Sequence, residues 1–157
     1  MKNKIFLINI ILIACMAGFG SCLKSGLDDL PAHEDADITD CYLEYRFSYT
    51  RPADQGTQVR TVRMTTVNKT IDAQASTVNV SVQTPGTDQY FTDEEKAKVS
   101  LANIAVYCYL SNTAKIEPLD GAPVLGTNGN YTSPVKYKVT AADGKTSKTW
   151  TISVTME

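Results

Sequence analysis

The stretch CYLEYRFSY, residues 41–49, decides the fold class of this chain. Apolar or aromatic residues occupy every second position from Cys41 to Tyr49, and polar or charged residues dominate the positions between them. Successive side chains of a β-strand point to opposite faces, so this period of two predicts a strand with one face in a protein core. The expected inward side chains are Cys41, Leu43, Tyr45, Phe47 and Tyr49.

The same alternation recurs in residues 77–83, 104–110, 135–139 and 150–156. The last two segments predict a hairpin, because Asp143 and Gly144 between them favour a tight turn. Residues 59–67 are rich in Val and Thr and predict another strand. A short helix is expected after Thr92, since Thr92 and Glu95 have the spacing of a capping box.

These elements together predict an all-β domain. A long loop is expected from Leu119 to Ser133, where Pro and Gly recur. Roughly seven short strands, with no long helix for a parallel crossover, favour an antiparallel immunoglobulin-like β-sandwich with one short helix. A small β-barrel is the alternative. Trp150 keeps step with the apolar positions of its strand, so we place it in the core.

The N-terminal residues predict export. Residues 1–21 begin with Lys2 and Lys4, continue through an apolar run and end in small residues, which is the form of a secretory signal peptide. Residues 22–37 then carry five carboxylates and one proline, which is typical of a solvated tether. We therefore divide the chain into a signal peptide (1–21), a lipidated acidic tether (22–37) and one sandwich domain (38–157).

Two cysteines compete as the site of lipid attachment. Cys15 follows Leu-Ile-Ala, and Cys22 follows Phe-Gly-Ser. We favour Cys22, because the polar tether begins directly after it, whereas cleavage at Cys15 would leave an apolar stretch in the mature protein. Acyl chains on Cys22 would hold the chain to a membrane by burying methylene groups, at about 0.8 kcal/mol each.

Cys41 and Cys108 both fall on the apolar sides of their strands, so they could meet in the core. An exported protein meets an oxidising compartment, in which such a pair can form a disulfide. The bond would close a roughly 67-residue loop and stabilise the domain by about 4 kcal/mol in the chain-entropy model. The alternative is two buried free thiols that act as small apolar groups.

The composition argues against several classes of function. The single histidine, His33, lies in the tether, and neither Cys41 nor Cys108 belongs to a C-x-x-C pair, so we expect no zinc site and no cofactor. The carboxylates at residues 93–95 fit the start of a helix better than the pair of catalytic carboxylates of a glycosidase. We therefore do not expect this protein to be an enzyme. Without the leader, 13 basic residues face 17 acidic ones, so nucleic acid is not an expected partner.

Three tyrosines are the candidate ligand-binding residues. Tyr42, Tyr107 and Tyr109 lie opposite the apolar sides of their strands. If the two strands are neighbours, the three rings form an exposed platform, and exposed aromatic patches are typical of binding surfaces. The alternative is simple cross-strand pairing on an outer face. Tyr131, in the long loop, is a further candidate of the same kind.

The two ends of the mature chain are similar to known proteins. The start GSCLKSGLDDLP (residues 20–31) and the finish YKVTAADGKT (137–146), continued by WTI (150–152), resemble surface lipoproteins of Bacteroides-type bacteria. The segments KVSLAN (98–103) and PLDGAP (118–123) resemble one group among them, the domain of unknown function 5018-related group, whose domain is immunoglobulin-like.

The resemblance implies a location and a broad role. Asp28 and Asp29 resemble the acidic signal that sends such lipoproteins to the outer face of the outer membrane. Proteins of this type often accompany outer-membrane systems for polysaccharide uptake, so the resemblance implies a glycan-binding or accessory module, with those uptake proteins as partners. The alternative is a structural or adhesion subunit that assembles with other surface proteins. No catalytic or ligand residues carry over from the family.

Overall fold

The computed structural model describes residues 32–50 and 56–157. The predicted signal peptide, the lipid-bearing Cys22 and most of the predicted tether lie outside these residues. In the described part of the chain, no helix is long and apolar enough to cross a membrane.

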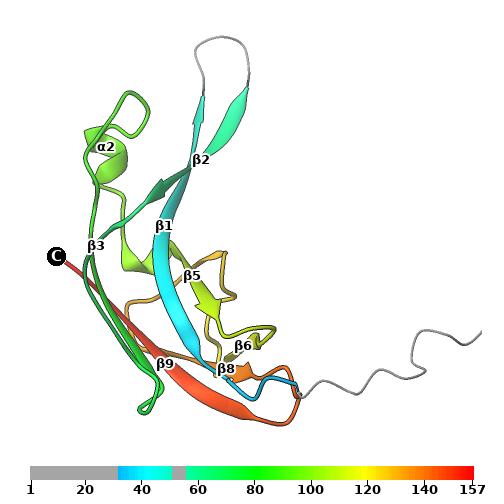
Figure 1. Ribbon diagram of the computed structural model, residues 1–157. Coiled ribbons are helices and arrows are strands. Elements are labelled where there is room, and N and C mark those ends of the chain that lie inside the picture. The colour runs from blue at the N-terminus through cyan, green and yellow to red at the C-terminus, as the bar shows by residue number, and fades with distance from the viewer. Residues whose placement is uncertain (1–31, 51–55) are drawn as a thin grey trace, which may run out of the picture. The chain divides into compact units, whose positions relative to one another are not determined.

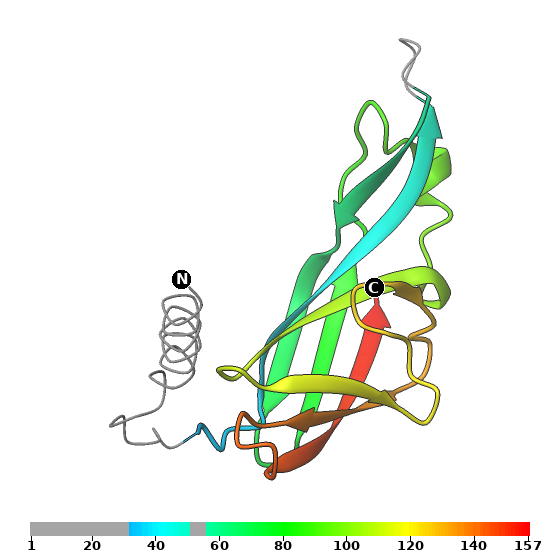
Figure 2. The same cartoon turned by 90° about the vertical axis from the view of Figure 1, so that its right-hand side faces the viewer.

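Two sheets pack face to face as a sandwich, which confirms the predicted all-β class (Figures 1 and 2). The first sheet has the order β2-β1-β5-β7, with β1 at Ile38–Thr50, β2 at Thr57–Arg63, β5 at Ile104–Leu110 and β7 at Asn128–Gly129. The second has the order β3-β4-β9-β8-β6, with β3 at Thr65–Asp72, β4 at Thr77–Gln83, β6 at Lys115–Leu119, β8 at Val135–Thr140 and β9 at Ser147–Met156. The long strands β1 (cyan) and β9 (red) therefore lie in different layers.

The core is built from the alternating positions that the sequence predicts. On β1, Cys41, Leu43, Tyr45 and Phe47 are buried, whereas the residues between them are partly exposed. The facing sheet contributes Val78, Val80 and Val82 from β4, Tyr137 and Val139 from β8, and Ile152 and Val154 from β9. Trp150 is fully buried, as predicted. Each fully buried aliphatic side chain contributes about 1.5–3 kcal/mol relative to an exposed one.

The predicted strand over residues 59–67 is divided between two sheets. Met64 interrupts it, because its side chain is buried and its N–H donates to the carbonyl of Leu43 at 2.9 Å. The chain before Met64 pairs with β1 as β2, and the chain after it pairs with β4 as β3. Val and Thr occur on both sides of this crossing, so the sequence has no turn signal there.

One strand pair departs from the predicted antiparallel arrangement. β4 and β9 run parallel, from Thr77 beside Thr151 to Val82 beside Met156, and the other strand pairs of residues 32–50 and 56–157 are antiparallel. Each of these two strands belongs to a different antiparallel hairpin: β4 pairs with β3, and β9 pairs with β8. Local turn signals do not determine how two such hairpins align.

Two short strands, β6 and β7, occur in segments for which the sequence predicted no strand. β6 contains Pro118, which lacks an N–H, and it lies at the edge of its sheet, where such a residue is tolerated. β7 lies inside the loop predicted from Leu119 to Ser133. The predicted helix is confirmed as α2 (Asp93–Lys96), and the Thr92 hydroxyl accepts the N–H of Glu95 at 3.4 Å. A 3₁₀ turn, η1 (Leu101–Asn103), follows it.

The last residues of the predicted tether pack on the sandwich. Ala36 is fully buried, and its carbonyl accepts the indole N–H of Trp150 at 2.9 Å. The N–H of Asp37 donates to the Ser111 hydroxyl at 3.1 Å, and the Asp37 carboxylate pairs with Lys148 at 2.6 Å. Packing therefore begins before residue 38, in a segment whose acidic composition gave no sign of it.

Candidate functional site

The tyrosine cluster, defined as Tyr42, Tyr107 and Tyr109, lies on the outer face of the four-stranded sheet. β1 and β5 are neighbours, as the prediction required, and Tyr42 lies directly opposite Tyr107. Their rings are nearly parallel, with an angle of 4° between planes and 4.9 Å between centroids. Tyr109 lies one position further along the same face of β5, with its centroid 5.9 Å from that of Tyr42 and its ring tilted by 38°.

Two arginines complete the cluster. The guanidinium carbon of Arg63, on β2, lies 4.2 Å from the Tyr42 centroid, and that of Arg46, on β1, lies 5.5 Å from the Tyr107 centroid. Both distances are within the range of cation–π attraction. The Arg46 guanidinium also donates to the carbonyl of Gly126 at 2.9 Å. The ring faces of Tyr42 and Tyr107 are therefore engaged by each other and by these cations.

Tyr109 has a different environment from its two neighbours. Its side chain is 57% exposed, whereas Tyr42 and Tyr107 are half-buried. Among the described residues it is the one aromatic side chain that is largely exposed. Burial and the nearby Glu44 carboxylate raise the pKa of the Tyr42 hydroxyl, so this group is protonated at neutral pH. Tyr109 thus supplies the open ring face of the cluster.

The residue that pairs with Tyr109 across the ladder is charged. Asp40 lies directly opposite Tyr109, and its carboxylate accepts from the Lys69 ammonium group of β3. This hydrogen bond holds the pKa of Asp40 below its usual value. Lys69 also donates to the Cys41 carbonyl at 3.3 Å. The exposed ring therefore has, as its cross-strand neighbour, a carboxylate that is bound to an ammonium group of the other sheet.

Tyr131 is not part of this surface, and its prediction as a ligand-binding residue is wrong. The side chain is 1% exposed, and its hydroxyl lies 3.1 Å from that of Tyr137 in the core. The N–H of Tyr131 donates to the carbonyl of Leu101 at 2.7 Å, which draws this part of the loop inward. The Pro and Gly residues of the loop indicated an exposed segment but not the direction of this ring.

Cys41 and Cys108 do meet, directly opposite each other on β1 and β5, with Cys41 fully buried and Cys108 half-buried. Both are free thiols in this structure. They lie on the inner face of the sheet whose outer face carries the tyrosine cluster.

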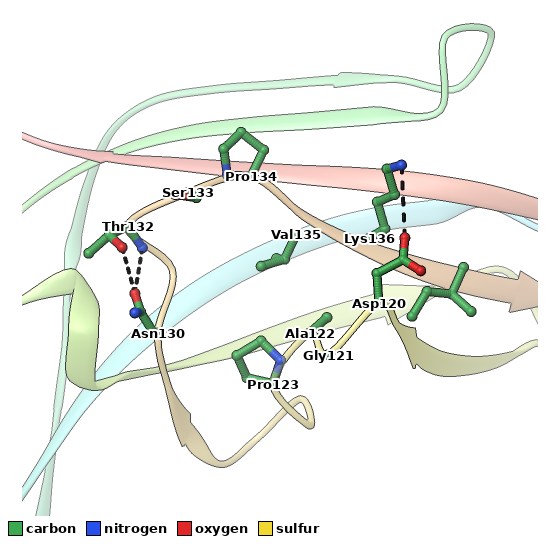
Figure 3. Close-up of a pocket in the computed structure, with 11 residues that line it drawn as sticks. Asp120, Gly121, Ala122, Pro123, Asn130, Thr132, Ser133, Pro134, Val135 and Lys136 are labelled. Atoms are coloured by element: carbon green, nitrogen blue, oxygen red, sulfur yellow. Dashed lines mark hydrogen bonds and ion pairs between the residues drawn. The ribbon is translucent and has the colours of Figure 1, made fainter.

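A second candidate site is a hollow of about 460 Å³ beside the β6–β8 edge (Figure 3). Residues 119–123, Asn130 and residues 132–136 line it. Figure 3 shows Asp120 and Lys136 together at one side. The Lys136 ammonium nitrogen lies 3.9 Å from a carboxylate oxygen of Asp120. None of the lining residues is aromatic, and both charged side chains are largely exposed. The tyrosine cluster therefore offers the stronger binding chemistry.

One loop contributes to both candidate sites. Pro123 lines the hollow, and Gly126, three residues later, packs against the Tyr107 ring. The N–H of Gly126 donates to the carbonyl of Val106 at 2.8 Å, which holds the loop to β5. Gly129, on β7, lies so close to Pro123 that a Cβ at position 129 would be 2.6 Å from Pro123 Cγ. The position of the loop thus depends on the missing side chain of Gly129.

We expect Gly129→Ala to lower the free energy of unfolding by about 1–3 kcal/mol, because the rigid Pro123 ring cannot yield without moving the loop. Urea denaturation measures the effect. Gly86→Ala is the matched control, since a Cβ there meets nothing within 4 Å, and it should leave stability nearly unchanged. Equal effects of the two substitutions would contradict this account of the loop.

The carboxylates at residues 93–95 and Asp120 lie in different parts of the domain. Glu95 accepts from the Tyr45 hydroxyl at 2.7 Å and pairs with Lys98, and burial together with the Glu95 hydrogen bond raises the pKa of Tyr45 to about 12. Asp120 pairs with Lys136 at the hollow instead. Within the described ranges, no three His, Cys, Asp or Glu side chains lie close enough together to hold a metal ion.

The sequence indicated the three tyrosines but missed Arg46, Arg63 and Gly126. Alternation places Arg46 outward on the face of Tyr42, so its direction was available. Its approach to Tyr107, and that of Arg63 to Tyr42, follow from the strand register and from the path of the loop. No local pattern in the sequence indicates the strand register or the path of the loop.

Comparison with solved structures places the fold among bacterial proteins. The chain is similar to a protein of Bacteroides fragilis NCTC 9343 that is predicted to be secreted, with 35% identity and a TM-score of 0.72 over 81% of this chain and 99% of the other. It also matches part of a predicted glycoside hydrolase of Bacteroides thetaiotaomicron, with 29% identity, a TM-score of 0.44 and coverage of 82% of this chain but 27% of the hydrolase. No curated protein matches the chain.

The family model named DUF5018-related matches residues 38–153, which include nearly all of both sheets and the whole tyrosine cluster. This agrees with the family resemblance of the segments at residues 98–103 and 118–123. The chain therefore belongs to the DUF5018-related family.

Proposed function

We propose that this protein is a non-enzymatic binding module, anchored by lipid at Cys22 to the outer face of the outer membrane, whose ligand is a polysaccharide. It would act alone or as an accessory of a glycan-uptake system. The observation that carries the proposal is the exposed ring of Tyr109 within a fixed cluster of aromatic and charged side chains.

The chemistry of the cluster fits a sugar. The C–H face of a pyranose ring is apolar and packs on an aromatic face, while its hydroxyl groups bond to charged donors and acceptors. Tyr109 supplies the ring face, and its cross-strand neighbour Asp40, which is bound to Lys69, supplies the charged groups. Because Tyr42 is stacked on Tyr107, the cluster is ordered before a ligand arrives, which reduces the entropy cost of binding.

The arrangement of the carboxylates supports a role without catalysis. A glycosidase holds two carboxyl groups on either side of the scissile bond, roughly 5 to 10 Å apart. Here Glu95 is engaged with Tyr45 and Lys98, and Asp120 faces Lys136. The hollow that Asp120 lines belongs to a different part of the fold from Glu95 on α2.

The location rests on similarity and on the predicted leader. The similar Bacteroides fragilis protein is predicted to be secreted, which supports an extracellular or cell-envelope location for this chain. The outer-membrane anchor and the surface orientation rest on the sequence of residues 1–31, in particular on Cys22, Asp28 and Asp29.

A second function, assembly with other surface proteins, is favoured by one observation. β2 is an edge strand, and its Val59 is 71% exposed. Edge strands with exposed apolar residues are sites where another strand can add. A partner that docks there would be insensitive to changes at Tyr109.

We expect a glycan array to detect binding by the wild-type protein and a loss of signal for Tyr109→Ala. Tyr109→Phe keeps the ring and should keep most of the signal. Val67→Ala, an exposed apolar residue on the other sheet, is the matched control and should bind as the wild type does. If no glycan binds, or if Tyr109→Ala binds equally well, the proposal fails and the β2 edge becomes the surface to test.

A further inference from the structure

The two cysteines occupy a specific type of position in the sheet. The carbonyl of Leu43 accepts from Met64, on the side of β1 that faces away from β5. The N–H and C=O groups of residues two positions apart point to the same side of a strand. Cys41 is two positions from Leu43, so its backbone groups also point away from β5. This is consistent with the Cys41 carbonyl accepting from Lys69.

The same reasoning applies to the opposite strand. The carbonyl of Val106 accepts from Gly126, on the side of β5 that faces away from β1, so the backbone groups of Cys108 point away from β1 as well. Cys41 and Cys108 therefore form a non-hydrogen-bonded pair of the antiparallel ladder. Such pairs bring their Cα atoms to about 4.5 Å, which is within the range of about 4.4–6.8 Å that a disulfide spans.

We propose that Cys41 and Cys108 form a disulfide that joins β1 to β5 directly behind the tyrosine cluster. The two cysteines are the chain neighbours of Tyr42, Tyr107 and Tyr109 and point to the opposite face of the same sheet. A bond between them fixes the separation of the two strands that carry the rings. The bond thereby holds the stack of Tyr42 on Tyr107 in register.

The different burial of the two thiols sets the order of the reaction. Cys108 is half-buried and Cys41 is fully buried, so an oxidising protein disulfide of the cell envelope reaches Cys108 first. The Cys108 thiolate attacks one sulfur of that disulfide and releases one thiolate of the oxidant. The Cys41 thiol then loses its proton and attacks the Cys108 sulfur, which releases the second thiolate of the oxidant; the released thiolates take up protons. The two cysteines lose two protons and two electrons, and the oxidant becomes a dithiol.

In the reduced protein the two thiols should differ in reactivity. A hydrogen bond with Cys108, together with burial, raises the pKa of Cys41 above its usual range. Its thiol is therefore protonated, and alkylating reagents should modify Cys108 well before Cys41. In the oxidised protein neither residue should react.

Peptide mapping of the full-length chain tests the proposal. The protein is isolated from membranes of cells that export it, and free thiols are blocked with N-ethylmaleimide at lysis and again in denaturant. We expect the peptides of Cys41 and Cys108 to be linked and to separate only after reduction. Complete alkylation of both, or a link from either one to another cysteine, would overturn the proposal. This mapping needs no ligand, so its failure is distinct from a failure of the glycan proposal.

A second measurement uses the purified chain and a variant. Reduction of the wild-type protein should lower Tm by on the order of 10 °C and weaken the near-UV circular dichroism of its tyrosines. Cys108→Ser should melt at the lower temperature and be unaffected by reductant. A wild-type Tm that reductant does not change would overturn the disulfide, and an unchanged tyrosine spectrum would overturn its effect on the stack.

Discussion

Trp150→Ala is expected to lower the free energy of unfolding by about 3–5 kcal/mol, one of the largest effects that a single substitution in this domain should have. The side chain is fully buried, so its removal leaves a cavity between the sheets. The substitution also removes the indole N–H that donates a hydrogen bond to the Ala36 carbonyl. A buried acceptor is then left without its partner. The segment at residues 35–37 then keeps only its bonds to Ser111 and Lys148, so its attachment to the sandwich should weaken.

Urea denaturation followed by far-UV circular dichroism measures this effect, because Trp150 is the one tryptophan of the chain and its fluorescence is lost in the variant. Trp150→Phe keeps much of the ring and loses the indole N–H, so it should cost less than Trp150→Ala. A midpoint for Trp150→Ala close to that of the wild type would mean that Trp150 is not a core residue.

Tyr137→Ala is expected to have a similarly large effect, about 3–5 kcal/mol, and to disturb both candidate sites. Tyr137 is fully buried on β8, and its hydroxyl donates to the carbonyl of Pro123 at 2.7 Å while it contacts the hydroxyl of Tyr131. Burial raises the pKa of the Tyr137 hydroxyl well above its usual range, so it remains a donor at all physiological pH values. Tyr137 thus anchors the loop of Pro123 and Gly126 to the core.

Tyr137→Phe separates the hydroxyl from the ring. It leaves the Pro123 carbonyl and the Tyr131 hydroxyl without this partner and should cost about 1–3 kcal/mol. Tyr49→Phe is the matched control, since the Tyr49 hydroxyl contacts Gln58 in a half-buried position, and it should cost less than Tyr137→Phe. Chemical denaturation compares the three variants, and equal stabilities of the two Phe variants would contradict the anchoring role.

Alternation along the strands could be predicted from the sequence, because it depends on local patterning alone. It correctly separated Leu43 from Tyr42, and it placed Trp150 in the core. Capping chemistry likewise located the start of α2 at Thr92. These features depend on neighbours that are close in the chain.

Features that depend on distant segments could not be predicted in this way. The buried Met64 carries the chain from one sheet to the other without a turn residue, and Tyr131 points inward because Leu101 binds its backbone. The stack of Tyr42 on Tyr107 was a conditional prediction, since it needed β1 and β5 to pair in one register. The half-buried state of Tyr107 follows from the loop at Gly126, so Tyr109 is the ring of the cluster that remains open to a ligand.

We propose that Tyr109 is the contact residue of a glycan-binding surface. Isothermal titration of the best glycan from the array against the wild type, Tyr109→Ala, Tyr109→Phe and Val67→Ala tests it most directly. We expect Kd to rise roughly tenfold for Tyr109→Ala, which corresponds to about 1.4 kcal/mol, and to change little for the other two variants. An unchanged Kd for Tyr109→Ala, with the variant folded as the wild type is, would contradict the claim.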